Sequence, residues 1–162
     1  MNWIATLGPV GYLRPAPGTW GSAAAVLLAL PLLYTHILIL FVLAIFAACA
    51  LGYVSIKAMT AGEADPDHSE IVIDELAGQW IALLPVAYGV WFTGASPLAL
   101  YPGLITAFIA FRVFDIWKPW IIGKADARKD AWGVMLDDIW AGVFAAVVVM
   151  VLATIAHLPV IL

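Results

Sequence analysis

The sequence of 162 residues contains little charge and a single cysteine. Only 11% of its residues are Asp, Glu, Lys or Arg, whereas about a quarter are charged in typical soluble domains. The net charge of −4 excludes the excess of Lys and Arg with which proteins bind nucleic acids. Cys49 has no second cysteine to pair with, which excludes a disulfide within the chain. The N-terminal segment lacks the basic residues that open a secretory signal peptide, so none is expected.

Apolar residues take the place of the missing charge. They make up 65% of the chain, and the mean hydropathy is +1.04. We therefore expect one membrane-embedded domain over residues 1–162. The alternative, a soluble all-helical bundle, would leave an exposed surface that is too apolar for water.

The few charged residues are confined to three parts of the chain. Residues 15–56, 76–111 and 139–162 contain no Asp, Glu, Lys or Arg. Because about 20 apolar residues cross a bilayer as one helix, the first two stretches can each hold a helical hairpin and the last a single helix. We predict an all-α polytopic membrane bundle of about five helices, the first of them short. The expected helices cover residues 20–34, 37–56, 70–90, 98–118 and 137–156.

This arrangement places all charged segments on one face of the membrane. All seven Lys and Arg residues lie there, so the positive-inside rule makes that face cytoplasmic. The N-terminus would then lie inside and the C-terminus outside. We expect an active site on this cytoplasmic face, where the polar side chains gather.

One short pattern, D-x-x-A-G, occurs twice, at Asp74–Gly78 and at Asp138–Gly142. Small residues one turn after an acid let two helices approach closely. The repeat predicts that the two helices cross with their acids facing each other. The alternative is chance, since Ala and Gly are frequent in this chain.

Two acidic pairs, Asp74–Glu75 and Asp137–Asp138, lie near expected helix starts. The helix dipole favours acids there by less than about 1 kcal/mol when they are exposed, which is the simpler explanation. However, Asp67 and Glu70 resemble a capping pair, which would place Asp74 a turn or two inside its helix. Buried carboxylates need a counter-charge, and Mg²⁺ prefers oxygen ligands. The four acids are therefore candidate metal ligands and candidate catalytic residues.

A third cluster, FRVFDIWKPW, contains Arg112, Asp115 and Lys118 at intervals of three residues. This spacing predicts one broad helix face, ended or kinked by Pro119. Two cations beside an acid suit a phosphate group and its metal, with Asp115 as a further candidate catalytic residue. A salt-bridged ladder of snorkelling side chains is the alternative.

The segment PAPGTWGS directly precedes the first apolar helix. Gly18 frees the backbone, while Thr19 and Ser22 are residue types that cap helices. A helix start of this kind offers unpaired N–H groups to an anion, which predicts a phosphate-binding role for these three residues. An ordinary helix cap is the alternative.

Together, four segments resemble the phosphatidylglycerophosphatase A family of bacterial membrane phosphatases: PAPGTWGS, IVIDELAG, FRVFDIWKPW and GVMLDDIWAG. The resemblance covers about residues 8–142. It implies Mg²⁺-dependent removal of the terminal phosphate of the lipid phosphatidylglycerophosphate, which leaves phosphatidylglycerol and inorganic phosphate. It also implies location in the bacterial cytoplasmic (inner) membrane. The motif residues carried over are Gly18, Thr19, Gly21, Ser22, Asp74, Glu75, Gly78, Arg112, Asp115, Lys118, Pro119, Asp137, Asp138 and Gly142.

The residues themselves fit metal-assisted hydrolysis, with the acids binding one or two Mg²⁺ ions and the two cations neutralising phosphate. One rival is a phospholipid-headgroup transferase, which would need a D-x-x-D-G-x-x-A-R motif that the sequence lacks. Another is a cation channel or transporter, which would place acids at mid-membrane or on both faces. The sequence does not indicate an oligomeric state.

Overall fold

The computed structural model describes residues 2–63 and 68–161, with side chains up to residue 156. Within these residues the chain is all-α, with eight α-helices, two short 3₁₀ helices and no β-strand. The elements are α1 (Asn2–Ala5), η1 (Val10–Tyr12), α2 (Pro17–Leu33), α3 (Leu38–Met59), α4 (Ile73–Ala82), α5 (Leu84–Thr93), η2 (Pro97–Leu100), α6 (Tyr101–Trp117), α7 (Ile121–Asp126) and α8 (Ala131–Ile161).

Three of these helices are long and apolar enough to cross a membrane: α3, α6 together with η2, and α8. The pair α4 and α5 passes the same test jointly, which gives up to four spans among the described residues, and α2 is an apolar helix of only 17 residues. The prediction of an all-α chain with a short first helix is confirmed, and three to four of the about five predicted membrane helices are long and apolar enough to span. The five predicted segments correspond to α2, α3, the α4–α5 pair, α6 and α8.

The predicted single helix over residues 70–90 is wrong in two respects. It begins at Ile73, and it bends by 47° at Leu83, where α4 ends. Pro85 lies in the first turn of α5, and it has no N–H and crowds the preceding turn, which accounts for the break. Asp74 therefore lies in the first turn of α4 rather than deeper in a helix capped by Glu70; Asp67 lies outside the described residues.

The last helix begins at Ala131, not at residue 137 as predicted. Asp130 caps it, because the Asp130 Oδ1 atom accepts the Gly133 N–H at 2.8 Å. Arg128 also donates to Asp130, and these hydrogen bonds lower the pKa of the Asp130 carboxyl. Asp137 and Asp138 consequently lie well inside α8 rather than at its start.

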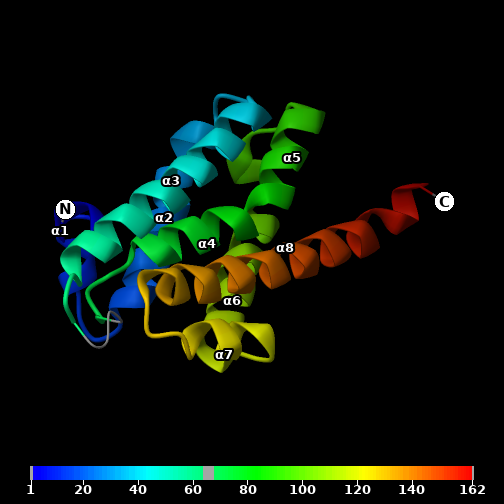
Figure 1. The fold of residues 1–162 in the computed structure, drawn as a ribbon. Helices are drawn as coiled ribbons and strands as arrows, with labels where there is room; N and C mark the ends of the chain where they lie inside the picture. Colours follow the sequence, from blue (N-terminus) through cyan, green and yellow to red (C-terminus); the bar gives the residue numbers. More distant parts are fainter. Residues whose placement is uncertain (1, 64–67, 162) are drawn as a thin grey trace.

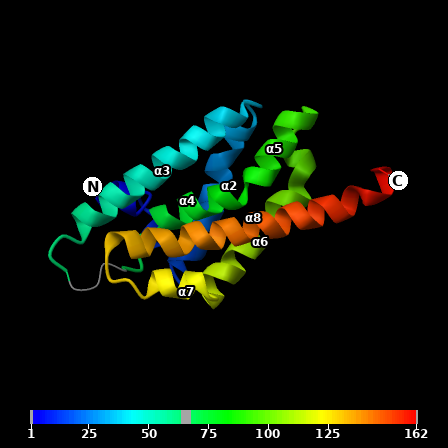
Figure 2. The same ribbon diagram turned by 45° about the vertical axis from the view of Figure 1, so that its right-hand side comes forward.

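The two helices that carry the D-x-x-A-G pattern, α4 and α8, lie side by side through the middle of the molecule (Figures 1 and 2). A Cβ atom on Gly142 would collide with the backbone carbonyl oxygen of Gly78, and one on Gly78 would lie 2.5 Å from the Asp138 carbonyl oxygen. The helices therefore touch backbone to backbone, as the repeated small residues predict. This contact brings the acids of both helices to one level of the bundle.

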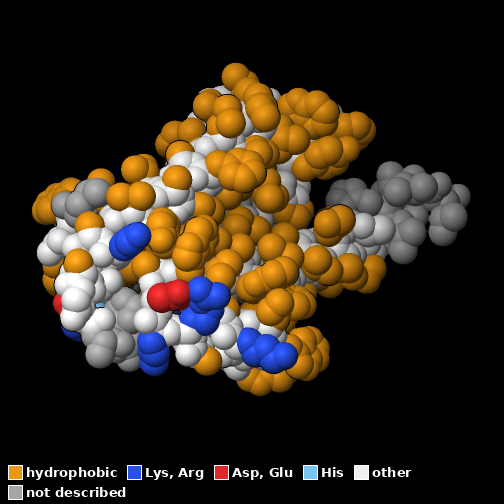
Figure 3. Space-filling model, in the orientation of Figure 1, with side chains coloured by type: hydrophobic (Ala, Val, Ile, Leu, Met, Phe, Trp, Pro, Cys, Tyr) orange, Lys and Arg blue, Asp and Glu red, His pale blue; other side chains and the backbone are white. Residues whose placement is uncertain are grey.

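Charged side chains are unevenly distributed over the face shown in Figure 3. There, Lys, Arg, Asp and Glu lie in its lower part and at its left, over α7, the start of α8 and part of α3, whereas its upper part is largely apolar. Phe46, Phe92 and Ile116 are among the large apolar side chains exposed on this protein. An exposed surface of this kind suits lipid tails, in agreement with a membrane location.

Candidate functional site

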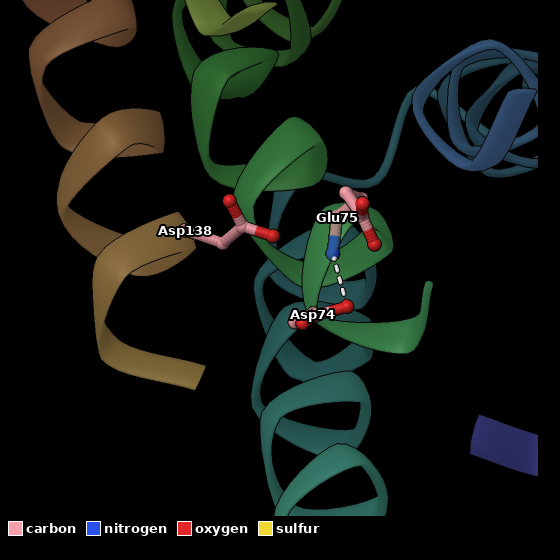
Figure 4. Close-up of side chains that lie close together, drawn as sticks. All are labelled: Asp74, Glu75 and Asp138. Atoms are coloured by element: carbon pink, nitrogen blue, oxygen red, sulfur yellow. Dashed lines mark hydrogen bonds between the residues drawn. The ribbon is translucent and has the colours of Figure 1, made fainter. Parts of the chain in front are cut away.

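Three carboxylates from α4 and α8 meet where the two helices touch. Asp74 and Glu75 lie in the first turn of α4, and Asp138 points from α8 toward them (Figure 4). An oxygen of each residue lies within 4.8 Å of an oxygen of the others. Asp74 also accepts the Glu75 N–H at 3.0 Å, which fixes its carboxylate. The expected pairing of Asp74 with Asp138 across a Gly contact is thus present in the structure.

A second group joins α6 to α8. It consists of Asp115, Asp137 and Asp138, whose carboxylate oxygens likewise lie within 4.8 Å of one another. Asp138 belongs to both groups. Five acids that lie far apart in the sequence therefore form one continuous acidic centre.

This acidic centre is largely buried, and some of its carboxylate oxygens lack hydrogen-bond partners among the described residues. The exposed fractions are 8% for Asp74, 7% for Asp137 and 3% for Asp138. Among the described residues, three carboxylate oxygens have no hydrogen-bond partner: Glu75 Oε2, Asp137 Oδ1 and Asp138 Oδ1. A buried carboxylate without a partner is strongly destabilising, so these oxygens fit a site for a hard divalent cation.

Arg112 connects the acidic centre to the N-terminus of α2. Its Nη1 atom forms an ion pair with Asp115 Oδ2 at 2.8 Å and donates to Ser22 Oγ at 3.3 Å. Ser22 donates in turn to the Gly18 carbonyl at 2.9 Å. A Cβ atom on Gly18 would meet the Glu75 carboxylate and the Arg112 guanidinium. Only a glycine lets the helix start approach this closely.

The prediction that Lys118 shares a helix face with Arg112 and Asp115 is wrong. The α6 helix ends at Trp117, and Lys118 follows with a positive φ of 49°, so its side chain turns toward α7 and α8. Its Nζ atom donates to Asp137 Oδ2 at 2.8 Å and to Asp126. Burial alone would lower the pKa of Lys118, but these two hydrogen bonds outweigh it and raise the pKa, so the side chain stays charged.

The remaining predicted residue, Thr19, is half-buried on α2 beside Gly18, and its role stays a prediction. Sequence reasoning missed Asp126 and Gln79. Gln79 is completely buried, and neither its side-chain nitrogen nor its oxygen has a hydrogen-bond partner among the described residues. Its position four residues after Glu75 was a usable signal, whereas nothing in the sequence links Asp126 to Lys118.

Fold and site together define a polytopic membrane protein with a buried acidic centre, bordered by an arginine and a helix N-terminus that suit an anion. The sequence profile of one family, phosphatidylglycerophosphatase A, matches residues 3–153. The chain belongs to this family of phosphoric monoester hydrolases.

Individual relatives agree with this assignment. The phosphatidylglycerophosphatase A of Haemophilus influenzae is 34% identical over 140 residues, which cover 86% of this chain and 80% of the relative. That of Escherichia coli is 32% identical over 134 residues, or 80% and 70% of the two chains. A Bacteroides thetaiotaomicron protein named putative phosphatidylinositol-3-phosphatase is 32% identical over 150 residues, or 87% and 86%. No solved structure matches this chain.

Proposed function

We propose that this protein hydrolyses the terminal phosphate of phosphatidylglycerophosphate with the help of Mg²⁺, producing phosphatidylglycerol and inorganic phosphate. One observation carries the proposal: the acidic centre adjoins both Arg112, which pairs with its Asp115, and the N-terminus of α2, where Gly18 lies against the Glu75 carboxylate and the Arg112 guanidinium. A cation site and an anion site are thereby adjacent, as metal-assisted phosphate hydrolysis requires. The family assignment supplies the substrate.

The residues divide the work by their chemistry. Asp74, Glu75, Asp137 and Asp138 would hold Mg²⁺, which when bound supplies charge neutralisation for the phosphate and a more acidic water molecule as nucleophile. Arg112 has its Nε atom without a partner among the described residues and can donate to a phosphate oxygen while Asp115 fixes its orientation.

The start of α2 would bind another phosphate oxygen. The first N–H groups of a helix lack partners within the helix and carry partial positive charge. Gly18 brings them next to Arg112, and Ser22 tethers the two through its hydroxyl. Lys118 would reach the phosphate only by giving up its hydrogen bond to Asp137 or Asp126. We therefore propose that its main role is to neutralise the acidic centre and that its contact with phosphate is secondary.

The alternatives account for fewer of these features. A channel or transporter needs polar groups along a path across the membrane, whereas the five acids described here form one compact group. A lipid carrying another phosphate monoester is a closer alternative, because one relative is named for a phosphoinositide. Nothing in the phosphate-binding residues themselves distinguishes the two headgroups.

The direct experiment is phosphate release from detergent micelles that contain one lipid at a time. We expect Mg²⁺-dependent release from phosphatidylglycerophosphate and loss of activity in EDTA. Because the family is named for phosphatidylglycerophosphate, we also expect less release from phosphatidylinositol 3-phosphate. Phosphatidylglycerol should be identified as the product by mass spectrometry. Activity that persists in EDTA would contradict the proposed role of Mg²⁺. Faster phosphate release from the phosphoinositide would contradict phosphatidylglycerophosphate as the substrate.

Replacing Arg112 with Gln should lower kcat/KM by about 10²-fold, since one charged donor to the phosphate is lost. Arg128→Gln is the matched control, because Arg128 is exposed and pairs only with Asp130 among the charged residues described. Both variants should be compared by kinetics after gel filtration shows a folded protein. An unchanged kcat/KM for Arg112→Gln would contradict a role in phosphate binding and leave Arg112 only as the salt-bridge partner of Asp115.

We further propose that the charged part of the molecule faces the cytoplasm of a bacterial cell, as the distribution of Lys and Arg favours. In a Cys49→Ser background, cysteines at Ala61 and Ala127 should react with a thiol reagent only from the cytoplasmic side. A cysteine at Ser96 should react only from the other side. All three positions are exposed and lie outside the long helices. Reaction of Ala61 and Ala127 variants from opposite sides would contradict the arrangement.

A further inference from the structure

We infer that the acidic centre binds two divalent cations rather than one, in neighbouring positions that share Asp138 as a ligand. The inference rests on the proposed function and adds the number of ions and the residues that hold each. The first position is formed by Asp74, Glu75 and Asp138, and the second by Asp115, Asp137 and Asp138. Asp115 thereby becomes a metal ligand as well as the partner of Arg112.

Geometry gives the first argument. Each of the two groups offers three carboxylate oxygens that lie within 4.8 Å of one another, close enough to surround one ion. Asp138 points from α8 toward Asp74 and Glu75 on α4 and has two oxygens to offer (Figure 4), and it also belongs to the second group. A carboxylate shared between two groups is the arrangement that two-metal phosphatase sites need to hold both ions close together.

The unpartnered oxygens give the second argument. Within the described residues, Glu75 Oε2 is unpartnered in the first group, Asp137 Oδ1 in the second, and Asp138 Oδ1 in both. Asp138 is only 3% exposed, so water cannot freely solvate it. One ion in the first position would leave Asp137 Oδ1 unsatisfied. Two ions account for all three oxygens.

Charge gives the third argument. When all five acids of the two groups are ionised, they carry five negative charges. The side chains of Arg112 and Lys118, which pair with two of these acids, contribute two positive charges. One divalent ion would leave one negative charge, which repels a phosphate monoester of charge about −2. Two ions leave one positive charge, which attracts it. Asp126, the other partner of Lys118, lies outside both groups; counting it makes each total more negative by one charge, so two ions still cancel the excess negative charge and one ion does not.

The two positions should differ in affinity. In the second group, Asp115 is already paired with Arg112 at 2.8 Å and Asp137 with Lys118 at 2.8 Å. An ion entering there must share its ligands with existing cations, whereas no ion pair to the acids of the first group occurs among the described residues. The first position therefore fills first and binds more tightly.

Manganese binding to the purified protein in detergent tests the inference, because Mn²⁺ is paramagnetic and takes the same oxygen ligands. Electron paramagnetic resonance of free Mn²⁺ should show two ions bound per chain with unequal affinity, and at saturation the bound ions should be magnetically coupled. Asp115→Asn should leave one uncoupled ion, and Asp138→Asn should weaken both sites at least tenfold. Asp130→Asn neutralises an exposed acid outside both groups and should bind two.

A second variant keeps the test decisive if Asp115→Asn fails to fold. Lys118→Met removes a cation that lies 2.8 Å from Asp137 Oδ2. It should tighten the weaker site by about tenfold while leaving the tighter site unchanged, since a competing charge has gone. A purely structural role of Lys118 predicts equal or weaker binding.

Phosphate release is measured on the same preparations to separate the two proposals. A wild-type protein that binds one Mn²⁺ and hydrolyses the lipid would overturn the two-ion inference alone. Two coupled ions in Asp115→Asn would also overturn it. Two coupled ions in a wild-type protein that releases no phosphate from the lipid would support the two-ion site and overturn the proposed function.

Discussion

Replacing Asp138 with Asn should abolish phosphatase activity, with a fall in kcat/KM of about 10³-fold or more. Asp138 is the one acid shared by both carboxylate groups, and it is almost completely buried. Asn keeps the size of the side chain and removes its charge, so the cation loses a negatively charged ligand at the point where the two groups meet. Loss of several kcal/mol of transition-state stabilisation corresponds to a rate loss of this size.

A stability measurement should accompany the kinetics. In wild-type protein, Mg²⁺ should raise the melting temperature, because an ion that binds only the folded state stabilises it. Asp138→Asn should lose this rise, yet be at least as stable as wild type without metal, since the repulsion between neighbouring carboxylates is relieved. Asp130→Asn is the control and should behave as wild type in both measurements. Wild-type activity in Asp138→Asn would show that this acid binds no catalytic ion.

The second large effect is expected from a single methyl group at the helix contact. In Gly142→Ala the new Cβ atom would overlap with the carbonyl oxygen of Gly78. The oxygen belongs to the backbone and the position of the Cβ atom is fixed by the backbone, so neither can rotate away. The helices α4 and α8 must then separate, which parts Asp74 and Glu75 from Asp138. We expect kcat/KM to fall by about 10²-fold and stability to fall by about 1–3 kcal/mol.

Gly89→Ala provides the matched control. A Cβ atom there would meet only the end of the Leu100 side chain, at 3.2 Å, and that side chain can move. Activity and melting temperature should therefore stay near wild-type values. If Gly142→Ala also stayed near wild type, the backbone contact between α4 and α8 would not determine the geometry of the site.

Much of the fold could be predicted because membrane proteins separate charge from apolar residues so strictly. The uncharged stretches 15–56, 76–111 and 139–162 correspond to the apolar helices, and the repeated D-x-x-A-G pattern marks the two helices that touch. The four acids of that pattern and its flanks do come together in the structure. The small residues of the D-x-x-A-G pattern are a local signal in the sequence. The contact between α4 and α8 could be predicted because it is formed by these same residues.

Other parts depend on details that composition does not reveal. The break at Leu83 follows from one proline inside a stretch treated as uniform. The early start of α8 follows from the Asp130 cap, which lies in a charged segment where no helix was predicted. Lys118 was misplaced because helical spacing was extended one residue past the end of α6. Its partner Asp126 lies on the separate short helix α7, and no sequence spacing encodes that contact.

The central claim is that carboxylates of α4 and α8 together bind the Mg²⁺ on which hydrolysis depends. A crystal or electron cryo-microscopy structure of the Mg²⁺-bound protein tests it most directly. We expect an ion bound by an oxygen of Asp138 and by an oxygen of Asp74 or Glu75, at about 2.0–2.1 Å each. An active, Mg²⁺-bound protein in which the ion lies elsewhere, with these carboxylates more than a ligand distance from it, would contradict the account.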